Sequence, residues 1–326
     1  MRRNLLASAT VAVAALSLAA CGTTEPASDD AAASGKSAGK ITLTDSKGTK
    51  VTLDGPATKV VATEWNVVED LVALGVDPVG VADVKGYAAW NTAAPLTGTP
   101  KDIGTRGEPS IDTVAALAPD LVVATSDLSP AVVKQLREVA PVLEISSADA
   151  ADQIGTMTEG LDLIAKATGK ETQADNVEKE FRASLAEGKK ALADAGLGGA
   201  EIASADGYVA SNQVSIRAFT GGSLLGAVNE QLGLKNAWTV EGDKSYGLAT
   251  TDVEGLTGLG DVQFSYIAND VDGDAFTGSL AKNAVWKSLP FVEDGNVHRL
   301  PDGVWMFGGP RSMEAYADSL VDALTK

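Results

Sequence analysis

The stretch DAADQIGTMTEGLDLIAKATGKETQADNVEKEFRASLAEGKKALADA, residues 149–195, contains two long helical patterns and scarcely a strand signal. The two patterns are broken near Gly169, where a glycine is well suited to end a helix. The second pattern, from Gln173 to Leu192, places apolar residues on one side of the helix: Val177, Phe181, Leu185 and Leu192. A long helix in the middle of the chain predicts a connection between two lobes.

On both sides of this stretch, short apolar runs alternate with helical patterns. Before it, we expect strands at Lys59–Thr63, Pro78–Ala82, Asp120–Thr125 and Pro141–Ile145, and helices at Val67–Leu74 and Ile111–Leu117. After it, we expect strands at Glu201–Ala205, Val262–Ala268 and Val297–Leu300, and helices at Gly222–Leu232, Val253–Leu259 and Arg311–Leu324. The alternation predicts two Rossmann-like α/β lobes with parallel-rich sheets, over residues 41–168 and 198–326, joined by a connecting helix within residues 169–197.

The N-terminal residues have the pattern of an export signal with a lipid attachment point. Arg2 and Arg3 precede a small apolar run that is too short for a stable membrane span, and the run ends at LAAC, residues 18–21. LAAC resembles the lipobox of bacterial lipoproteins, in which the cysteine is diacylated and the chain is cut just before it. We therefore expect a signal peptide over residues 1–20, a lipid-anchored Cys21 at the extracytoplasmic face of the cell membrane, and a flexible tether over the small and polar residues 21–40. The alternative is an uncleaved apolar N-terminus with a buried cysteine.

The composition excludes several kinds of partner and site. Beyond residue 20 the chain has 24 Lys and Arg against 44 Asp and Glu, a formal charge of −20, which disfavours nucleic acid and anionic lipid headgroups as partners of the surface as a whole. Cys21 is the only cysteine, so its lipidation leaves none for a disulfide or a thiolate metal site.

Motifs of catalysis are absent from the sequence. The single histidine, His298, has no neighbours that suggest a catalytic triad or a histidine metal site. The acidic run at residues 269–274 is similar to a calcium loop, but with Gly273 at the turn position Ala268 and Ser279 stand where carboxylates belong. No glycine loop has the spacing of a nucleotide site. We therefore expect a protein that is not an enzyme and that holds no metal ion through its own side chains.

The few aromatic residues and one arginine indicate a ligand cleft. Aromatic residues are 5% of the chain, and five of them lie in segments that we expect to be loops: Tyr87, Trp90, Tyr246, Trp305 and Phe307. Large rings in loops after strands belong either to a cleft beyond the strand ends or to packing between lobes. Arg106 lies in a glycine-rich turn before a helix that Ser110 can cap, and its guanidinium suits an oxygen-rich ligand. The alternative for Arg106 is a surface ion pair with Glu108 or Asp112.

An ordered set of segments resembles the iron-siderophore-binding lipoproteins of ABC importers, and most of all their ferric hydroxamate binders. The first-lobe segments are EWNVVE at 64–69, GVAD at 80–83 with Tyr87 and Trp90 after it, GTRGEP at 104–109 and LAPDL at 117–121. The second-lobe segments are NAW at 236–238, LPFV at 289–292 and VWMFG at 304–308. The resemblance covers essentially the whole body of the chain. It implies the class III periplasmic-binding-protein fold, with two α/β lobes, a rigid helix between them and a shallow ligand cleft.

The resemblance also implies roles for individual residues. The implied ligand-binding residues are Trp65, Tyr87, Trp90, Arg106, Tyr246, Trp305 and Phe307. Asp112 and Glu254 match helix-start carboxylates that pair with arginines of the permease. Their alternative role is local, because Asp112 suits a helix N-terminus in any protein and Thr251 with Glu254 forms a capping-box pattern.

The implied function is capture of a ferric siderophore by a monomer and its delivery to an ABC permease and its ATPase. A ferric trihydroxamate is near neutral or singly positive, so one arginine and aromatic walls suffice for it, whereas a tris-catecholate carries about three negative charges in typical form and needs more cations. We therefore expect a ferrioxamine-like hydroxamate, with the iron held by the siderophore and no other cofactor. The alternatives are a cobalamin or haem binder of the same fold and, more remotely, an exported hydrolase.

Overall fold

The computed structural model describes residues 39–210 and 213–326. The expected signal peptide, Cys21 and nearly all of the expected tether lie outside these residues. The chain divides into two units, Met1–Ser37 and Ala38–Lys326, and the description below concerns the second. Within the described ranges, no helix is both long enough and apolar enough to cross a membrane.

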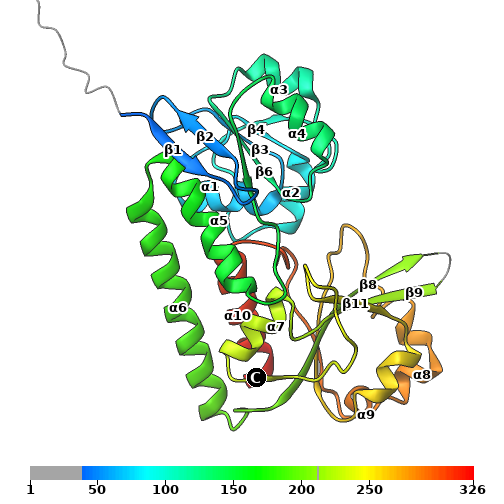
Figure 1. Cartoon of the computed structure of the whole chain (residues 1–326). Coiled ribbons are helices and arrows are strands. Elements are labelled where there is room, and N and C mark those ends of the chain that lie inside the picture. Colours follow the sequence, from blue (N-terminus) through cyan, green and yellow to red (C-terminus); the bar gives the residue numbers. More distant parts are fainter. Residues whose placement is uncertain (1–38, 211–212) are drawn as a thin grey trace, which may run out of the picture. The chain divides into compact units, whose positions relative to one another are not determined.

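The first lobe is built on a five-stranded parallel sheet with the strand order β5-β4-β3-β6-β7 (Figure 1). Its strands are β3 (Val60–Ala62), β4 (Gly80–Val81), β5 (Lys101–Asp102), β6 (Leu121–Thr125) and β7 (Val142–Ile145), and its helices are α1 (Trp65–Ala73), α2 (Val84–Trp90), α3 (Ile111–Leu117) and α4 (Pro130–Arg137). The inner strands are buried and, apart from Thr125 at the end of β6, apolar, because both faces of the sheet are covered. An antiparallel hairpin that the sequence did not predict, β1 (Ile41–Thr44) and β2 (Lys50–Leu53), precedes the sheet.

The second lobe contains a six-stranded mixed sheet. The strand order is β11-β9-β8-β12-β13, with β10 paired to β8; β10, β12 and β13 run parallel to β8, and β9 is antiparallel to its neighbours. The strands are β8 (Glu201–Ala210), β9 (Gln213–Phe219), β10 (Lys235–Asn236), β11 (Leu248–Thr251), β12 (Gln263–Ile267) and β13 (Val297–Arg299). The helical segments are α7 (Leu224–Gln231), η1 (Glu254–Gly258), η2 (Leu280–Lys282), α8 (Ala284–Lys287) and α9 (Pro290–Glu293). The predicted α/β character of both halves is confirmed.

The helices between the sheets are α5 (Gln153–Thr168) and α6 (Glu171–Asp194), as the sequence of residues 149–195 predicts. Gly169 ends α5 in the left-handed conformation, with φ of 67°, which a glycine adopts without strain. The apolar side of α6 is buried, and the C-terminal helix α10 (Pro310–Thr325) packs against α6 (Figure 1).

One apolar core extends across both lobes. It includes Leu71 of α1, Phe181 of α6, Ile202 of β8 and Tyr316 of α10, all almost fully buried. A large change in the angle between the lobes would expose part of this core, so the core opposes wide opening. The lobe boundaries at residues 168 and 198 remain predictions, because residues from both sides pack into this one unit.

Two predictions of local structure were wrong. Tyr87 and Trp90, expected in a loop, lie in α2, whose first turn is capped by Asp83: its Oδ1 accepts a hydrogen bond from Gly86 N at 3.0 Å. This helix has only seven residues and an internal glycine, so it lacks a clear amphipathic pattern. Residues 254–258 form the 3₁₀ turn η1 instead of an α-helix. The side chain of Asp252, rather than that of Thr251, accepts a hydrogen bond from this turn, through Oδ1 from Gly255 N at 3.1 Å.

Candidate functional site

The candidate site lies beyond the carboxyl ends of the parallel strands, where open α/β sheets place their ligands. In the first lobe a charged residue follows each of four strands: Glu64 after β3, Asp83 after β4, Arg106 after β5 and Asp127 after β6. Two adjoining cavities of about 860 and 690 Å³ lie here. Both are bordered by Arg106 from the first lobe and by Arg217 and Trp305 from the second, so they form one cleft between the lobes.

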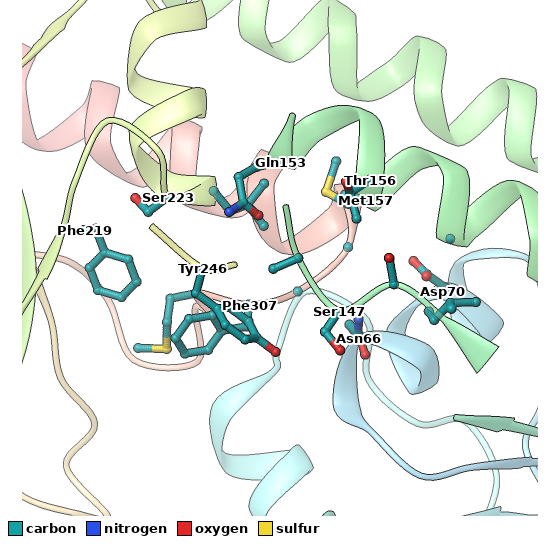
Figure 2. Close-up of a pocket in the computed structure, with 18 residues that line it drawn as sticks. Asn66, Asp70, Ser147, Gln153, Thr156, Met157, Phe219, Ser223, Tyr246 and Phe307 are labelled. Carbon is teal, nitrogen blue, oxygen red and sulfur yellow. The ribbon is translucent and has the colours of Figure 1, made fainter. Parts of the chain in front are cut away.

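A continuous group of aromatic rings lines this cleft. The Trp305 ring lies edge-on to Trp65, with centroids 4.7 Å apart, and to Trp90 at 6.0 Å. Phe307 contacts Trp305 at 5.3 Å and Tyr246 at 5.6 Å. Figure 2 shows the Tyr246 and Phe307 rings next to each other. Five of the aromatic residues proposed from the sequence are thus brought together, although they come from both lobes.

Arg106 is held in a fixed position within the cleft. Its guanidinium carbon lies 4.1 Å from the centroid of Trp65 and 5.2 Å from that of Trp305, and its Nη1 donates to Glu64 Oε1 at 2.8 Å. Glu64 Oε1 also accepts from the first N–H of α1, at Trp65. The alternative of an ion pair with Glu108 or Asp112 is therefore wrong in its partner, because Arg106 pairs with Glu64. Stacking and pairing together orient the guanidinium.

A second cleft arginine, Arg217, was missed from the sequence. It lies on β9 directly opposite Asp206 of β8; its Nε donates to Asp206 Oδ1 at 3.0 Å and its Nη2 to Oδ2. Burial raises the pKa of Asp206, although the neighbouring guanidinium acts in the opposite direction. The alternation of polar and apolar residues over 213–218 was the available signal, since it is typical of a strand and places Arg217 on the polar face.

Tyr87 does not belong to the cleft, and its prediction as a ligand-binding residue is corrected. Its side chain is fully buried, and its hydroxyl donates to the carbonyl of Ala94 at 2.5 Å. The prediction assumed a loop, whereas α2 turns Tyr87 toward the core and leaves Trp90 at the cleft. His298 also lies away from both cavities, half-buried, with Nε2 2.7 Å from Gln263 Oε1.

Hydrogen bonds join the two lobes at the edges of the cleft. The Tyr246 hydroxyl donates to Asp127, and Trp90 Nε1 donates to Asp272 Oδ2 at 2.8 Å. Burial raises the pKa of Tyr246, so its hydroxyl keeps the proton that it donates. Two residues proposed for ligand contact, Tyr246 and Trp90, therefore also form hydrogen bonds between the lobes.

A small cavity of about 30 Å³ lies next to Tyr246 and Phe307 and extends toward Asp70 (Figure 2). Asp70 of α1 is 3% exposed, and its Oδ1 has no hydrogen-bond partner among the described residues. Burial, with a smaller contribution from the charge of Glu69, raises the pKa of the Asp70 carboxyl well above its usual range.

The Asp70→Asn variant is expected to be more stable than the unchanged protein at pH 8, by about 1–3 kcal/mol. The folded-state pKa of Asp70 is raised, so its contribution to stability is complete below about pH 4 and is lost as the pH rises toward the folded-state value. Asparagine does not ionise, so the difference shrinks toward pH 4. Urea unfolding at pH 4, 6 and 8 measures it, with Asp175→Asn on the exposed side of α6 as the control. A variant less stable than the parent at pH 8 contradicts this account.

Asp112 and Glu254, the residues proposed to contact a permease, are both exposed. Asp112 lies in the first turn of α3, where Ser110 Oγ accepts from Thr113 N at 3.3 Å as predicted, and Glu254 begins η1. Their docking role stays a prediction. Within residues 39–210 and 213–326, no three His, Cys, Asp or Glu side chains gather as a metal-binding group.

The comparisons with known proteins agree with this geometry. Residues 60–303, about three quarters of the chain, match the family model described as periplasmic binding protein. The chain is 26% identical to the iron(3+)-hydroxamate-binding protein FhuD of Escherichia coli, over 82% of this chain and 86% of FhuD. It is 29% identical to the Fe(3+)-citrate-binding protein YfmC of Bacillus subtilis, over 88% of each chain, and 27% identical to the putative ABC transporter substrate-binding lipoprotein YhfQ of B. subtilis, over 82% of each.

A solved structure shares the fold. The siderophore-binding protein FhuD of Vibrio cholerae, crystallised with Fe³⁺-Desferal, superposes with a TM-score of 0.73 at 26% identity, over 82% of this chain and 98% of that chain. The family consists of proteins that bind solutes. With two α/β lobes, a cleft between them and a family match over most of its length, this chain belongs to the periplasmic binding protein family.

Proposed function

We propose that the protein captures a ferric hydroxamate siderophore outside the cytoplasm and delivers it to an ABC permease. The observation that carries the proposal is the cleft itself, in which the Arg106 guanidinium lies over the rings of Trp65 and Trp305. A ferric trihydroxamate presents iron-bound oxygens on one side and an apolar carrier on the other, so a rigid fork of N–H donors and aromatic walls match its two surfaces. The likeness to the two FhuD proteins supports the same ligand class.

One arginine was expected in the cleft from the sequence, and a second, Arg217, borders the same two cavities. With two arginines in the cleft, the number of cations no longer excludes an anionic ferric complex. Each arginine is, however, paired with a carboxylate, Arg106 with Glu64 and Arg217 with Asp206. Neither pair contributes net charge. The cleft therefore still lacks the excess positive charge that a tris-catecholate needs, and a hydroxamate remains the preferred ligand. Ferric citrate is the second candidate, because YfmC is named for it.

The proposed route of delivery rests on the N-terminal sequence and on the relatives. Cys21 carries the lipid that holds the protein at the membrane, and a relative, YhfQ, is named as a lipoprotein of an ABC transporter. Asp112 and Glu254, both exposed, are the proposed contacts with the permease. We propose a monomer that binds its ligand without transforming it.

Tryptophan fluorescence tests the ligand class directly. Three of the five tryptophans border the cleft or contact its wall, namely Trp65, Trp90 and Trp305. We expect saturable quenching when ferrioxamine B is titrated into the purified full-length chain, since a ferric complex within several ångströms of the rings quenches their emission. Inner-filter corrections come from free tryptophan titrated in the same way.

Parallel titrations distinguish the other ligands. Ferric enterobactin, ferric citrate, haem and cobalamin are expected to quench weakly or not at all. Saturable quenching by one of these ligands alone would keep the transport role and replace the hydroxamate. The absence of quenching by every ligand, in a chain shown to be folded by circular dichroism, would overturn the proposed function.

A further inference from the structure

Three carboxylates of the cleft have no cationic partner within residues 39–210 and 213–326. The charged side chains that border the two cavities, within the described residues, are six acids and three bases: Glu64, Asp83, Asp127, Asp206, Asp272 and Asp274, with Lys85, Arg106 and Arg217. Both arginines are paired within this set, with Glu64 and Asp206. Asp274 pairs with Arg299, whose guanidinium also contacts Asp270 and Asp302. The remaining acids outnumber the remaining base.

The three remaining acids are Asp83, Asp127 and Asp272, and each accepts its hydrogen bond from a neutral donor. Asp83 Oδ1 accepts from the N–H of Gly86 at 3.0 Å, and Asp272 Oδ2 from Trp90 Nε1 at 2.8 Å. Asp127 accepts from the hydroxyl of Tyr246. A neutral donor orients a carboxylate and satisfies one lone pair without cancelling its charge. Lys85, an exposed residue of α2, is the one unpaired cation among the cleft-lining residues that the structure describes.

The three acids are distributed around the opening. Asp83 follows β4, Asp127 follows β6, and Asp272 lies in the second lobe after β12. They therefore border the cleft from both lobes, and their electrostatic potentials add at a bound ligand. A cleft lined by one sign of charge between low-dielectric walls concentrates its field on the ligand.

We infer that this cleft selects ferric hydroxamates that carry a positive charge, such as a complex with a free protonated amine, over neutral and anionic complexes of the same iron core. The inference rests on the proposed function and specifies the charge of its ligand. With about two net negative charges within roughly 6–10 Å of a ligand, affinity falls on the order of tenfold for each unit of positive charge removed from the ligand. Salt of a few tenths molar shortens the screening length and reduces the difference.

A series of ligands with one iron core tests the inference. Ferrioxamine B carries a protonated amine; its N-acetyl derivative is neutral, its N-succinyl derivative is anionic, and the methyl ester of the succinyl derivative is neutral at nearly the same size. Dissociation constants are measured by tryptophan quenching at pH 7 in 20 and 300 mM NaCl. We expect affinity to fall from the cationic to the neutral to the anionic complex, with a smaller spread at high salt. The ester separates charge from bulk.

Two sets of variants connect the preference to the three acids. In the triple variant Asp83→Asn, Asp127→Asn and Asp272→Asn, the acceptor oxygens remain and three charges are removed, so we expect the spread between ligands to fall to threefold or less. Asparagine also tolerates the left-handed conformation of Asp83, with φ of 52°. The control, with Glu159→Gln, Asp175→Asn and Glu293→Gln, removes three exposed charges that border neither cavity and should keep the spread.

The outcomes separate the inference from the proposed function. Equal affinities for all four complexes, or tighter binding of the anionic one, overturn the charge preference and leave the hydroxamate function standing. A spread that does not change with salt in the unmodified protein also overturns it, whether or not the triple variant folds. Failure of every complex to bind overturns the proposed function and the inference with it.

Discussion

Replacing Arg106 by alanine is expected to weaken the binding of ferrioxamine B by about 10- to 100-fold, or about 1.4–2.8 kcal/mol, without unfolding the protein. The side chain is partly exposed and packs against Trp65 and Trp305 at the cleft, so its loss removes donors and leaves Glu64 without its cation. The loss of hydrogen bonds acts at contact distance and outweighs the more distant attraction that a more negative cleft exerts on a cationic ligand. Tryptophan quenching measures the change.

Two further variants determine how Arg106 acts. Arg106→Lys keeps the charge but loses the planar fork and its stacking, so we expect it to recover only part of the lost affinity. Arg182→Ala removes an arginine on the exposed part of α6, paired with Glu178 one helical turn away, and should leave affinity unchanged. Full affinity in both Arg106 variants would show that the guanidinium does not contact the ligand.

Replacing Glu69 by alanine is expected to lower the free energy of unfolding by about 3–5 kcal/mol, the largest effect on stability that we predict. Glu69 of α1 is fully buried and binds the start of α10: Oε1 accepts from Ser312 N at 2.7 Å and Oε2 from Ser312 Oγ at 2.5 Å. Oε2 also accepts from Asn91 Nδ2 at 2.6 Å. The helix has no side-chain cap of its own, because Gly309 stands at its N-cap position. Alanine removes the acceptor of three buried donors, of which only Asn91 Nδ2 keeps another, Ser312 Oγ at 3.2 Å.

The matched variants separate the acceptor from the charge. Burial raises the pKa of Glu69, while the hydrogen bonds from Ser312 and Asn91 lower it. Burial of the carboxylate costs free energy, and its two oxygens offset this cost by accepting those hydrogen bonds. Glu69→Gln preserves the size and one acceptor and should cost about 1–2 kcal/mol. Glu159→Ala, at an exposed position of α5, should cost less than about 0.5 kcal/mol. Denaturation midpoints in urea measure all three. A Glu69→Ala protein as stable as the control would remove Glu69 from this role.

Most of the fold follows from local patterns in the sequence. The apolar side of residues 173–192 and the glycine at 169 predict α5 and α6 with their break, because helix periodicity and a left-handed glycine are properties of a few neighbouring residues. The buried parallel strands are predicted for the same reason, since a short apolar run between Pro, Gly and Asp residues is typical of a buried strand. The short α2 and the hairpin strand β9 were missed, the first because seven residues show no reliable period.

The sequence predicted most residues of the candidate site but not the contacts that these residues make. Trp90, Arg106, Tyr246, Trp305 and Phe307 were proposed from unusual residues in loops and from the resemblance, and all of them border the cleft. Tyr87 was proposed on the same grounds and is buried. The direction of a ring on a helix depends on its position around the helix axis, so one missed helix was enough to misplace the Tyr87 ring.

The sequence by itself determined the two α/β lobes, the helix between them, and an arginine with aromatic residues at the strand ends, because these depend on neighbours in the chain. The tertiary structure alone decided which charges cancel. Arg106 pairs with Glu64, 42 residues away in the sequence, and Glu69 binds Ser312 of α10, 243 residues away. Arg217 pairs with Asp206 because the register of β8 and β9 places them opposite each other. Local patterns carry no information on such distant pairs, since each depends on how whole elements pack. The charge of the cleft, and hence the ligand that it favours, is a property of the folded protein.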